Sequence, residues 1–213
     1  MKNKLIFCSG ILTALLCADL PLDLVIDTLA GFSYPLHSFY AENEINAEKK
    51  IGDQGWYAGL GNTLIYEHPG VSDEFTLYTG ISIREMLKLS IYPRLIFNGE
   101  ISFSSGAVIA LNHDFKKSGI RICDENEFEF NFHDYVFTYV NTLEISRAFA
   151  INENTEFSLS VENELCLCSG NAENCLCAGP CITCGIFSLY ANYTLVFDKP
   201  MVHGTEIGAV LAF

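Results

Sequence analysis

The sequence ends with Glu206-Ile207-Gly208-Ala209-Val210-Leu211-Ala212-Phe213. This stretch follows the pattern polar, any residue, glycine, any two residues, apolar, any residue, aromatic. Successive side chains of an extended chain point to opposite faces, so Leu211 and Phe213 share one face. The pattern predicts that Thr205–Phe213 is a β-strand with an apolar face.

The same two-residue alternation runs through most of the chain. In Phe157–Leu165, for example, Phe157, Leu159 and Val161 alternate with serines and glutamates. The other alternating segments are Leu22–Tyr34, Trp56–Tyr66, Phe75–Arg84, Leu87–Phe97, Ile101–Leu111, Phe128–Phe132, Tyr135–Ser146 and Phe187–Phe197. Turn signals such as His68-Pro69-Gly70 and Asn98-Gly99 separate them. The periodicity therefore predicts an all-β protein.

Composition narrows the class further. Half of the 213 residues are apolar and 18% are charged, yet past the N-terminus no run of eighteen apolar residues occurs, which disfavours transmembrane helices. The net charge of −14 disfavours binding to nucleic acid, because an acidic surface repels phosphates.

Alternation alone fits both a soluble sandwich or lipocalin-type barrel and a barrel with its apolar face in a membrane. Three features favour the membrane. The segments are about ten residues long, the polar face is rich in Ser, Thr, Asn and Gly, and aromatic residues cluster at segment ends. These aromatics are Trp56, Tyr66, Phe75, Tyr135, Phe187 and Phe197.

In its last eight residues the chain resembles the bacterial outer-membrane β-barrel proteins, which end in such a closing strand. By pattern it is similar to small barrels of the OmpA, OmpX and opacity type. The resemblance implies that Glu206, Gly208, Leu211 and Phe213 form the C-terminal signal for the barrel-assembly machinery. It also implies a location in the bacterial outer membrane, in contact with its lipid.

The first eighteen residues have the form of a cleaved signal peptide. Lys2 and Lys4 precede an apolar stretch, and Ala18 offers a small residue for cleavage. A membrane anchor and lipidation at Cys17 are the alternatives. The predicted organisation is thus a signal peptide over residues 1–18 and a single barrel domain over residues 19–213.

The segments predict eight to ten strands, with ten preferred. The apolar series changes from even to odd numbers at His133-Asp134, which indicates either a tight turn or a bulge. Ten strands fit a turn, because single-chain bacterial barrels have an even number of strands.

With the apolar face outside, charged residues fall in the lumen. We expect a basic patch from Arg84, Lys88 and Arg94. Acidic residues come from the other segments: Asp23, Asp27, Glu144, Glu162, Glu164 and Glu206. In a narrow barrel these charges pair and fill the interior; a small pore between basic and acidic walls is the alternative.

Six of the nine cysteines fall within one stretch, 166–184, which we expect to be a loop. The disulfide candidates are Cys166, Cys168, Cys175, Cys177, Cys181 and Cys184, with Cys123 elsewhere. In an exported protein this suggests a stapled loop, cross-linking to other cysteine-bearing envelope proteins, or, less favoured, a zinc or iron–sulfur site. As a cysteine-bearing barrel the chain is similar to the major porins of some obligate intracellular bacteria, with no further shared motif. Ten strands would place residues 169–182 on the periplasmic side.

These observations predict an outer-membrane barrel with a structural or surface-interaction role, without cofactor or metal. A narrow porin is the first alternative. A lipid-modifying enzyme is the second, and no residue stands out as catalytic.

Overall fold

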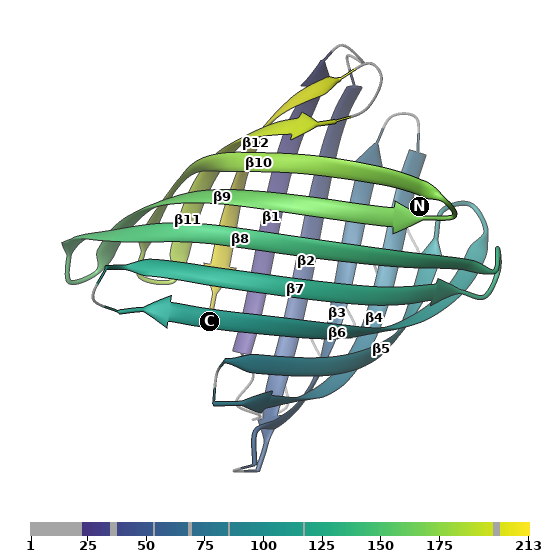
Figure 1. The fold of residues 1–213 in the computed structure, drawn as a ribbon, viewed down its shortest axis with the longest axis horizontal. Helices are drawn as coiled ribbons and strands as arrows, with labels where there is room; N and C mark the ends of the chain where they lie inside the picture. Colours follow the sequence, from purple (N-terminus) through teal and green to yellow (C-terminus); the bar gives the residue numbers. More distant parts are fainter. Residues whose placement is uncertain are drawn as a thin grey trace.

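The computed structural model describes residues 23–34, 38–52, 54–67, 70–84, 86–116, 118–197 and 201–213. They form a closed barrel of antiparallel strands (Figure 1). The strands are β1 (Asp23–Tyr34), β2 (Ser38–Ile51), β3 (Trp56–Glu67), β4 (Gly70–Ile83), β5 (Leu87–Phe97), β6 (Ile101–Phe115), β7 (Ile120–Asn131), β8 (Val136–Asn152), β9 (Thr155–Cys168), β10 (Asn171–Cys184), β11 (Phe187–Val196) and β12 (Val202–Ala212). The predicted signal peptide lies outside the described residues.

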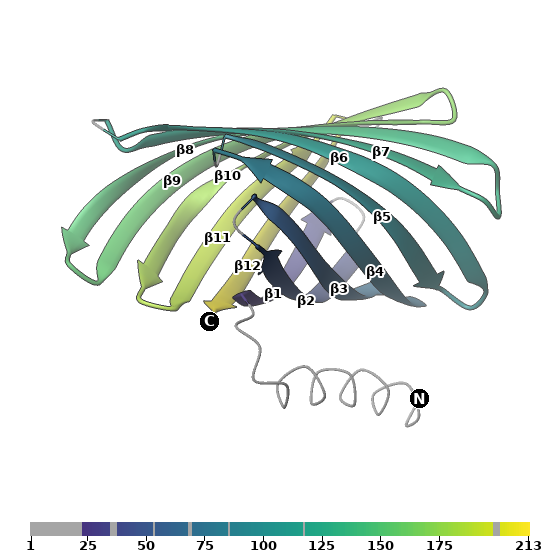
Figure 2. The ribbon, with the colours of Figure 1, turned by 90° about the horizontal axis from the view of Figure 1, so that it is seen from below.

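Each strand pairs with its neighbours in sequence, and β12 closes the barrel on β1. The closing register joins Val25 to Ala212 and Tyr34 to His203. Because the strand number is even, β12 ends beside the start of β1 (Figure 2). The connections between strands are two to five residues long at both ends of the barrel. Among the described residues, no helix has the length and apolar character needed to cross a membrane.

The barrel has twelve strands, so the preferred count of ten was wrong. The ten alternating segments correspond to ten of the strands, and the two missed ones are β2 and β10. Twelve strands also exceed the eight of OmpA- and OmpX-type barrels. The predicted loop at 166–184 was wrong as well, because most of this stretch is strand β10 and the end of β9.

The break in periodicity at His133-Asp134 is a tight turn between β7 and β8. The side chain of Asn131 accepts hydrogen bonds from the backbone N–H groups of His133 (2.8 Å) and Asp134 (3.4 Å). Tyr135 follows with a φ of 56°, in the left-handed region. The turn, rather than a bulge, therefore produces the change of register.

The outer face of the barrel is apolar and exposed. Large apolar side chains are open there, including Ile91 (62%), Ile101 (68%) and Ile207 (68%). Some polar pairs interrupt this face: the Asn62 amide donates to Asp73 (2.7 Å), and that of Asn163 to Asn174 (2.8 Å). By contrast, the buried apolar side chains among the described residues are Ala47, Tyr57, Tyr92 and Ala110. The barrel thus lacks the large apolar core that stabilises a soluble protein.

Interior tyrosines pack over glycines of the neighbouring strand. The ring of Tyr190 on β11 covers Gly208 on β12, where a Cβ atom would lie 2.6 Å from Cε1 of the ring. The other pairs are Tyr40 over Gly31, Tyr57 over Gly80, Tyr78 over Gly59 and Tyr92 over Gly106. The glycine of the C-terminal pattern therefore makes room for a ring, which agrees with the close approach expected at Gly208.

Candidate functional site

The interior of the barrel carries most of the charged side chains of the strands. Contacts between strands that are not neighbours identify this face. Lys88 on β5 reaches Glu48 on β2 with an Nζ–Oε2 distance of 2.8 Å. Tyr190 on β11 donates to Asp27 on β1 at 3.1 Å. Side chains that meet across intervening strands lie on the concave side of the sheet, so these residues face inward.

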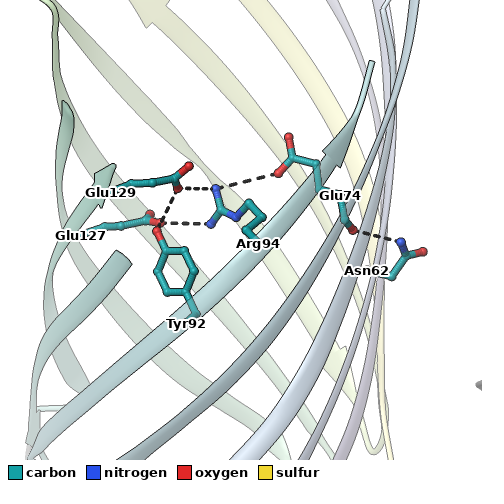
Figure 3. Close-up of polar contacts among 6 residues, drawn as sticks. All are labelled: Asn62, Glu74, Tyr92, Arg94, Glu127 and Glu129. Atoms are coloured by element: carbon teal, nitrogen blue, oxygen red, sulfur yellow. Dashed lines mark hydrogen bonds and ion pairs between the residues drawn. The ribbon is translucent and has the colours of Figure 1, made fainter. Parts of the chain in front are cut away.

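Arg94 lies at the centre of the largest interior cluster (Figure 3). Its guanidinium is 2.7 Å from Glu129, 3.0 Å from Glu127 and 3.9 Å from Glu74. Tyr92 donates hydrogen bonds to Glu127 and, at 2.9 Å, to Glu129. One arginine is thus surrounded by three carboxylates that come from β4 and β7, on both sides of its own strand β5.

The predicted basic patch does not form. Lys88 and Arg94 do face the interior, but each is paired with carboxylates. Arg84 follows the end of β4 in a turn, with a φ of 52°, and takes no part in the wall. Lys88 and Arg94 therefore form ion pairs with neighbouring glutamates and do not form a positive surface.

The predicted acidic residues do lie on the interior face. Asp27 contacts Tyr190, Glu206 accepts hydrogen bonds from Tyr40 and Thr194, and Asp23 lines an interior cavity. Glu144 pairs with Glu162 in the register of β8 and β9, and Glu164 follows two residues later on the same face.

Sequence reasoning missed many other interior carboxylates. They are Glu42, Glu44 and Glu48 on β2, Glu74 on β4, Glu125, Glu127 and Glu129 on β7, and Glu173 on β10. On β7 the signal was present, because these glutamates alternate with Asn126, Phe128 and Phe130. The described cations on the inner face are Lys88 and Arg94, together with Lys50 and Arg121, which are exposed next to strand ends. The interior is therefore strongly acidic.

A cavity of about 520 Å³ opens within the barrel. Its walls come from β1, β2 and β4 to β7. Glu44, Glu48, Glu125 and Glu127 line it, together with Lys88, Tyr92 and Arg94. The cavity is thus bounded mainly by polar and charged groups, which water can solvate.

The described cysteines are all free. Cys175, Cys177 and Cys181 share the inner face of β10, because they alternate with outward-facing Leu176 and Ile182. Cys166 and Cys168 share the inner face of β9, and Cys123 lies on the inner face of β7. No two cysteines of β9 and β10 are direct cross-strand partners. Cys166, for example, faces Glu173 and Val140. The predicted staple of a loop onto itself is absent from this arrangement, and residues 169–170 turn at the end of the barrel opposite to the C-terminus.

The remaining residues of the C-terminal pattern divide between the two faces. Leu211 pairs with Phe187 and Ile26 on the outer face, and Phe213 is 61% exposed. Glu206 points inward, to Tyr40 and Thr194. This is the arrangement expected for a closing strand; its recognition by the assembly machinery stays a prediction.

Comparison with known proteins identifies the fold and no family. No known protein family and no curated protein matches the sequence. Among solved structures, LpxR from Salmonella typhimurium has a TM-score of 0.60 at 7% identity, with 90% of this chain and 100% of that chain covered. KdgM porin has a TM-score of 0.58 at 8% identity, with 89% and 99% covered. The β domain of the Bordetella autotransporter BrkA has a TM-score of 0.56 at 14% identity, with 90% and 99% covered. The chain therefore has the fold of bacterial outer-membrane β-barrels. The similarity to OmpA- and OmpX-type barrels and to cysteine-bearing porins stays a prediction.

Proposed function

We propose that this protein spans a bacterial outer membrane and forms a water-filled pore that favours cations. The observation that carries the proposal is the excess of carboxylates on the interior face over the cations there, which are Lys88, Arg94 and the exposed Lys50 and Arg121.

The membrane location is supported by the distribution of apolar side chains. The outer face exposes large aliphatic residues, whereas few apolar residues are buried inside. Exposed aromatics lie at both strand ends, for example Trp56 (48%) and Tyr66 (41%) at the two ends of β3. An apolar band between aromatic girdles is typical of transmembrane barrels. In water this surface would be an aggregation hazard, since contiguous apolar patches on monomers rarely exceed a few hundred Å².

The pore is supported by the charge of the interior. A dry lumen requires that buried charges be paired, because an unpaired ion in a low-dielectric interior costs several kcal/mol. These few cations cannot pair with carboxylates on eight of the twelve strands. Solvating water and mobile counter-ions accommodate the remaining carboxylates, which favours a hydrated lumen over one filled only with interlocked side chains.

The short connections between strands also favour a pore over a surface-interaction role. Surface-interaction proteins place their binding residues on loops, whereas here the connections are two to five residues long. The interior position of Cys166, Cys168, Cys175, Cys177 and Cys181 also disfavours disulfides to other envelope proteins. We therefore prefer the narrow porin to the structural or surface-interaction role predicted first. The absence of enzymatic activity remains a prediction.

Ion selectivity of the refolded protein in a planar bilayer tests the proposal. Under a KCl gradient, we expect stepwise conductance. The reversal potential should have the sign that a pore more permeable to K⁺ than to Cl⁻ produces. Two double variants remove two carboxylates each. E125Q/E162Q acts on the interior face, and the control D73N/D124N acts on the outer face.

Cation preference should fall in E125Q/E162Q and stay unchanged in D73N/D124N, because only interior charges face permeating ions. No unitary conductance, a preference for Cl⁻, or equal shifts in both variants would overturn the proposal.

A further inference from the structure

The outer face of β3 to β6 is hollowed by a furrow that begins at the barrel end where the chain termini lie. It consists of two cavities of about 310 and 540 Å³. Thr79 and Ile91 line both cavities, so the two adjoin. Trp56, at the start of β3, lines the smaller cavity, and Pro93, deeper along the wall on β5, lines the larger one. We call this hollow the outer furrow.

Short side chains and a break in strand pairing produce the outer furrow. Thr79, Ser105 and Ala107 point outward among leucine and isoleucine side chains, which leaves a depression in the apolar surface. Pro93 has no N–H group, and the pairing of β4 with β5 is interrupted opposite it, between Thr76 and Thr79. The depression therefore follows from residue size and from the backbone pairing.

An indole and a cation lie at the mouth of the outer furrow. The backbone N–H of Ser82 donates to the carbonyl of Gly55 at 2.8 Å, which places Trp56 beside the end of β4. Arg84 follows Ser82 by two residues and is exposed in the turn. Of the carboxylates that the structure describes, none forms an ion pair with Arg84. Tryptophan and arginine are typical of the level at which lipid headgroups meet the hydrocarbon.

The basic residues outside the lumen gather toward this end of the barrel. Those on the outer face or in turns of the described chain are Lys49, Arg84, Lys116 and Arg147. At the opposite end, the described turn residues include Glu100 and Asp134 but no lysine or arginine. The charges outside the lumen therefore favour anionic headgroups at the end where the outer furrow opens.

We propose that the outer furrow binds an anionic phospholipid, with an acyl chain in the furrow and the phosphate at Arg84. The dimensions fit one leaflet. Arg84 is seven residues from Leu77, which lines the larger cavity, so about 23 Å of strand separates them. Half of the hydrocarbon core is about 15 Å thick, and a strand tilted by about 45° crosses it in about 21 Å. A guanidinium can bind a phosphate through two parallel hydrogen bonds.

The proposal rests on the membrane location proposed above and not on conduction. Trp56 is the chain's single tryptophan and lines the furrow, so quenching of its fluorescence by brominated acyl chains reports occupancy. The protein is folded into phosphatidylcholine vesicles that contain a small fraction of one brominated lipid. Brominated phosphatidylglycerol should quench as strongly as an about fivefold higher fraction of brominated phosphatidylcholine, which corresponds to ~1 kcal/mol for one basic residue at an anionic lipid.

Two pairs of variants separate the furrow from general effects of charge and surface. R84Q should lose the preference for phosphatidylglycerol, whereas R147Q should keep it, because Arg147 lies on β8 outside the furrow. A107F should also lose the preference, because its ring would fill the smaller cavity. A191F is the control on the outer face of β11 and should keep it. Reduced electrophoretic mobility after heating verifies that each variant folds.

Equal quenching by the two brominated lipids would overturn the proposal. So would an unchanged preference in R84Q or A107F, or a loss in R147Q as large as that in R84Q. These failures are distinguishable from failure of the proposed function. Quenching of Trp56 by neither lipid would refute the membrane location as well, whereas equal quenching by both would refute only lipid binding in the outer furrow.

Discussion

Replacement of Arg94 by glutamine removes the cation from the interior cluster and leaves its carboxylates facing one another. Three acidic partners lie at 2.7, 3.0 and 3.9 Å. A charge pair about 3 Å apart is worth about 1.4 kcal/mol at the dielectric constant of water and about 5 kcal/mol at an effective value of 20. The Arg94 side chain is 24% exposed and that of Glu129 15%, so the true environment lies between these limits.

We expect R94Q to lower the free energy of unfolding by about 2–3 kcal/mol, less than the ~3–5 kcal/mol for breaking a fully buried pair. The measurement is unfolding by urea in lipid vesicles, followed by the fluorescence of Trp56, the chain's single tryptophan. R121Q is the matched control. Arg121 also contacts a carboxylate at 3.0 Å, that of Asp114, but their side chains are 63% and 53% exposed. Its loss should cost less than about 1 kcal/mol.

The triple variant R94Q/E127Q/E129Q separates electrostatics from packing. If repulsion between the orphaned glutamates causes the loss, neutralising two of them should restore most of the stability. R94Q as stable as the wild type, or a triple variant no more stable than R94Q, would refute the reasoning.

Two further predictions concern the wall itself. G208A should destabilise the barrel by about 1–3 kcal/mol, as overpacking does, because the added Cβ would meet the ring of Tyr190. G204A is the control, because the nearest atom to its added Cβ is Cβ of Thr194 at 3.4 Å. It should be nearly neutral in the same unfolding assay. N163L/N174L should raise the free energy of unfolding in vesicles, because it replaces an amide pair on the outer face with apolar groups. A decrease of more than about 1 kcal/mol, the scale of a net hydrogen bond, would argue that the amides contact another protein.

The sequence predicted ten strands because their outward residues are large and apolar and their inward residues are polar. β2 fails this test at Asn43 and Lys49, which lie on the same outer face as Ile45 and Ile51. Two-residue periodicity cannot distinguish such a strand from a polar loop, and only its partners on both sides fix its register.

β10 escaped prediction for the opposite reason. Its inward positions carry cysteines, which are usually buried apolar residues, and its outward positions include the small Ala178 and the ring of Pro180. Polar and apolar faces are therefore not distinguishable from residue type alone. Pro180 also lacks an N–H group, and the pairing with β11 is interrupted between Ala178 and Cys181. The cysteines suggested a stapled loop, whereas the register of β9 and β10 makes no two of their cysteines direct cross-strand partners.

The two missed strands bear directly on the proposed pore. Barrel diameter grows with strand number, and about eight strands leave an interior that side chains fill. Adding β2 and β10 widens the lumen and at the same time brings in Glu42, Glu44 and Glu48 from one strand and Glu173 from the other. The only inward-facing cation on these two strands is Lys50, next to the end of β2. A wider interior with more unpaired negative charge favours water over packed side chains, so the corrected strand count itself argues for a pore.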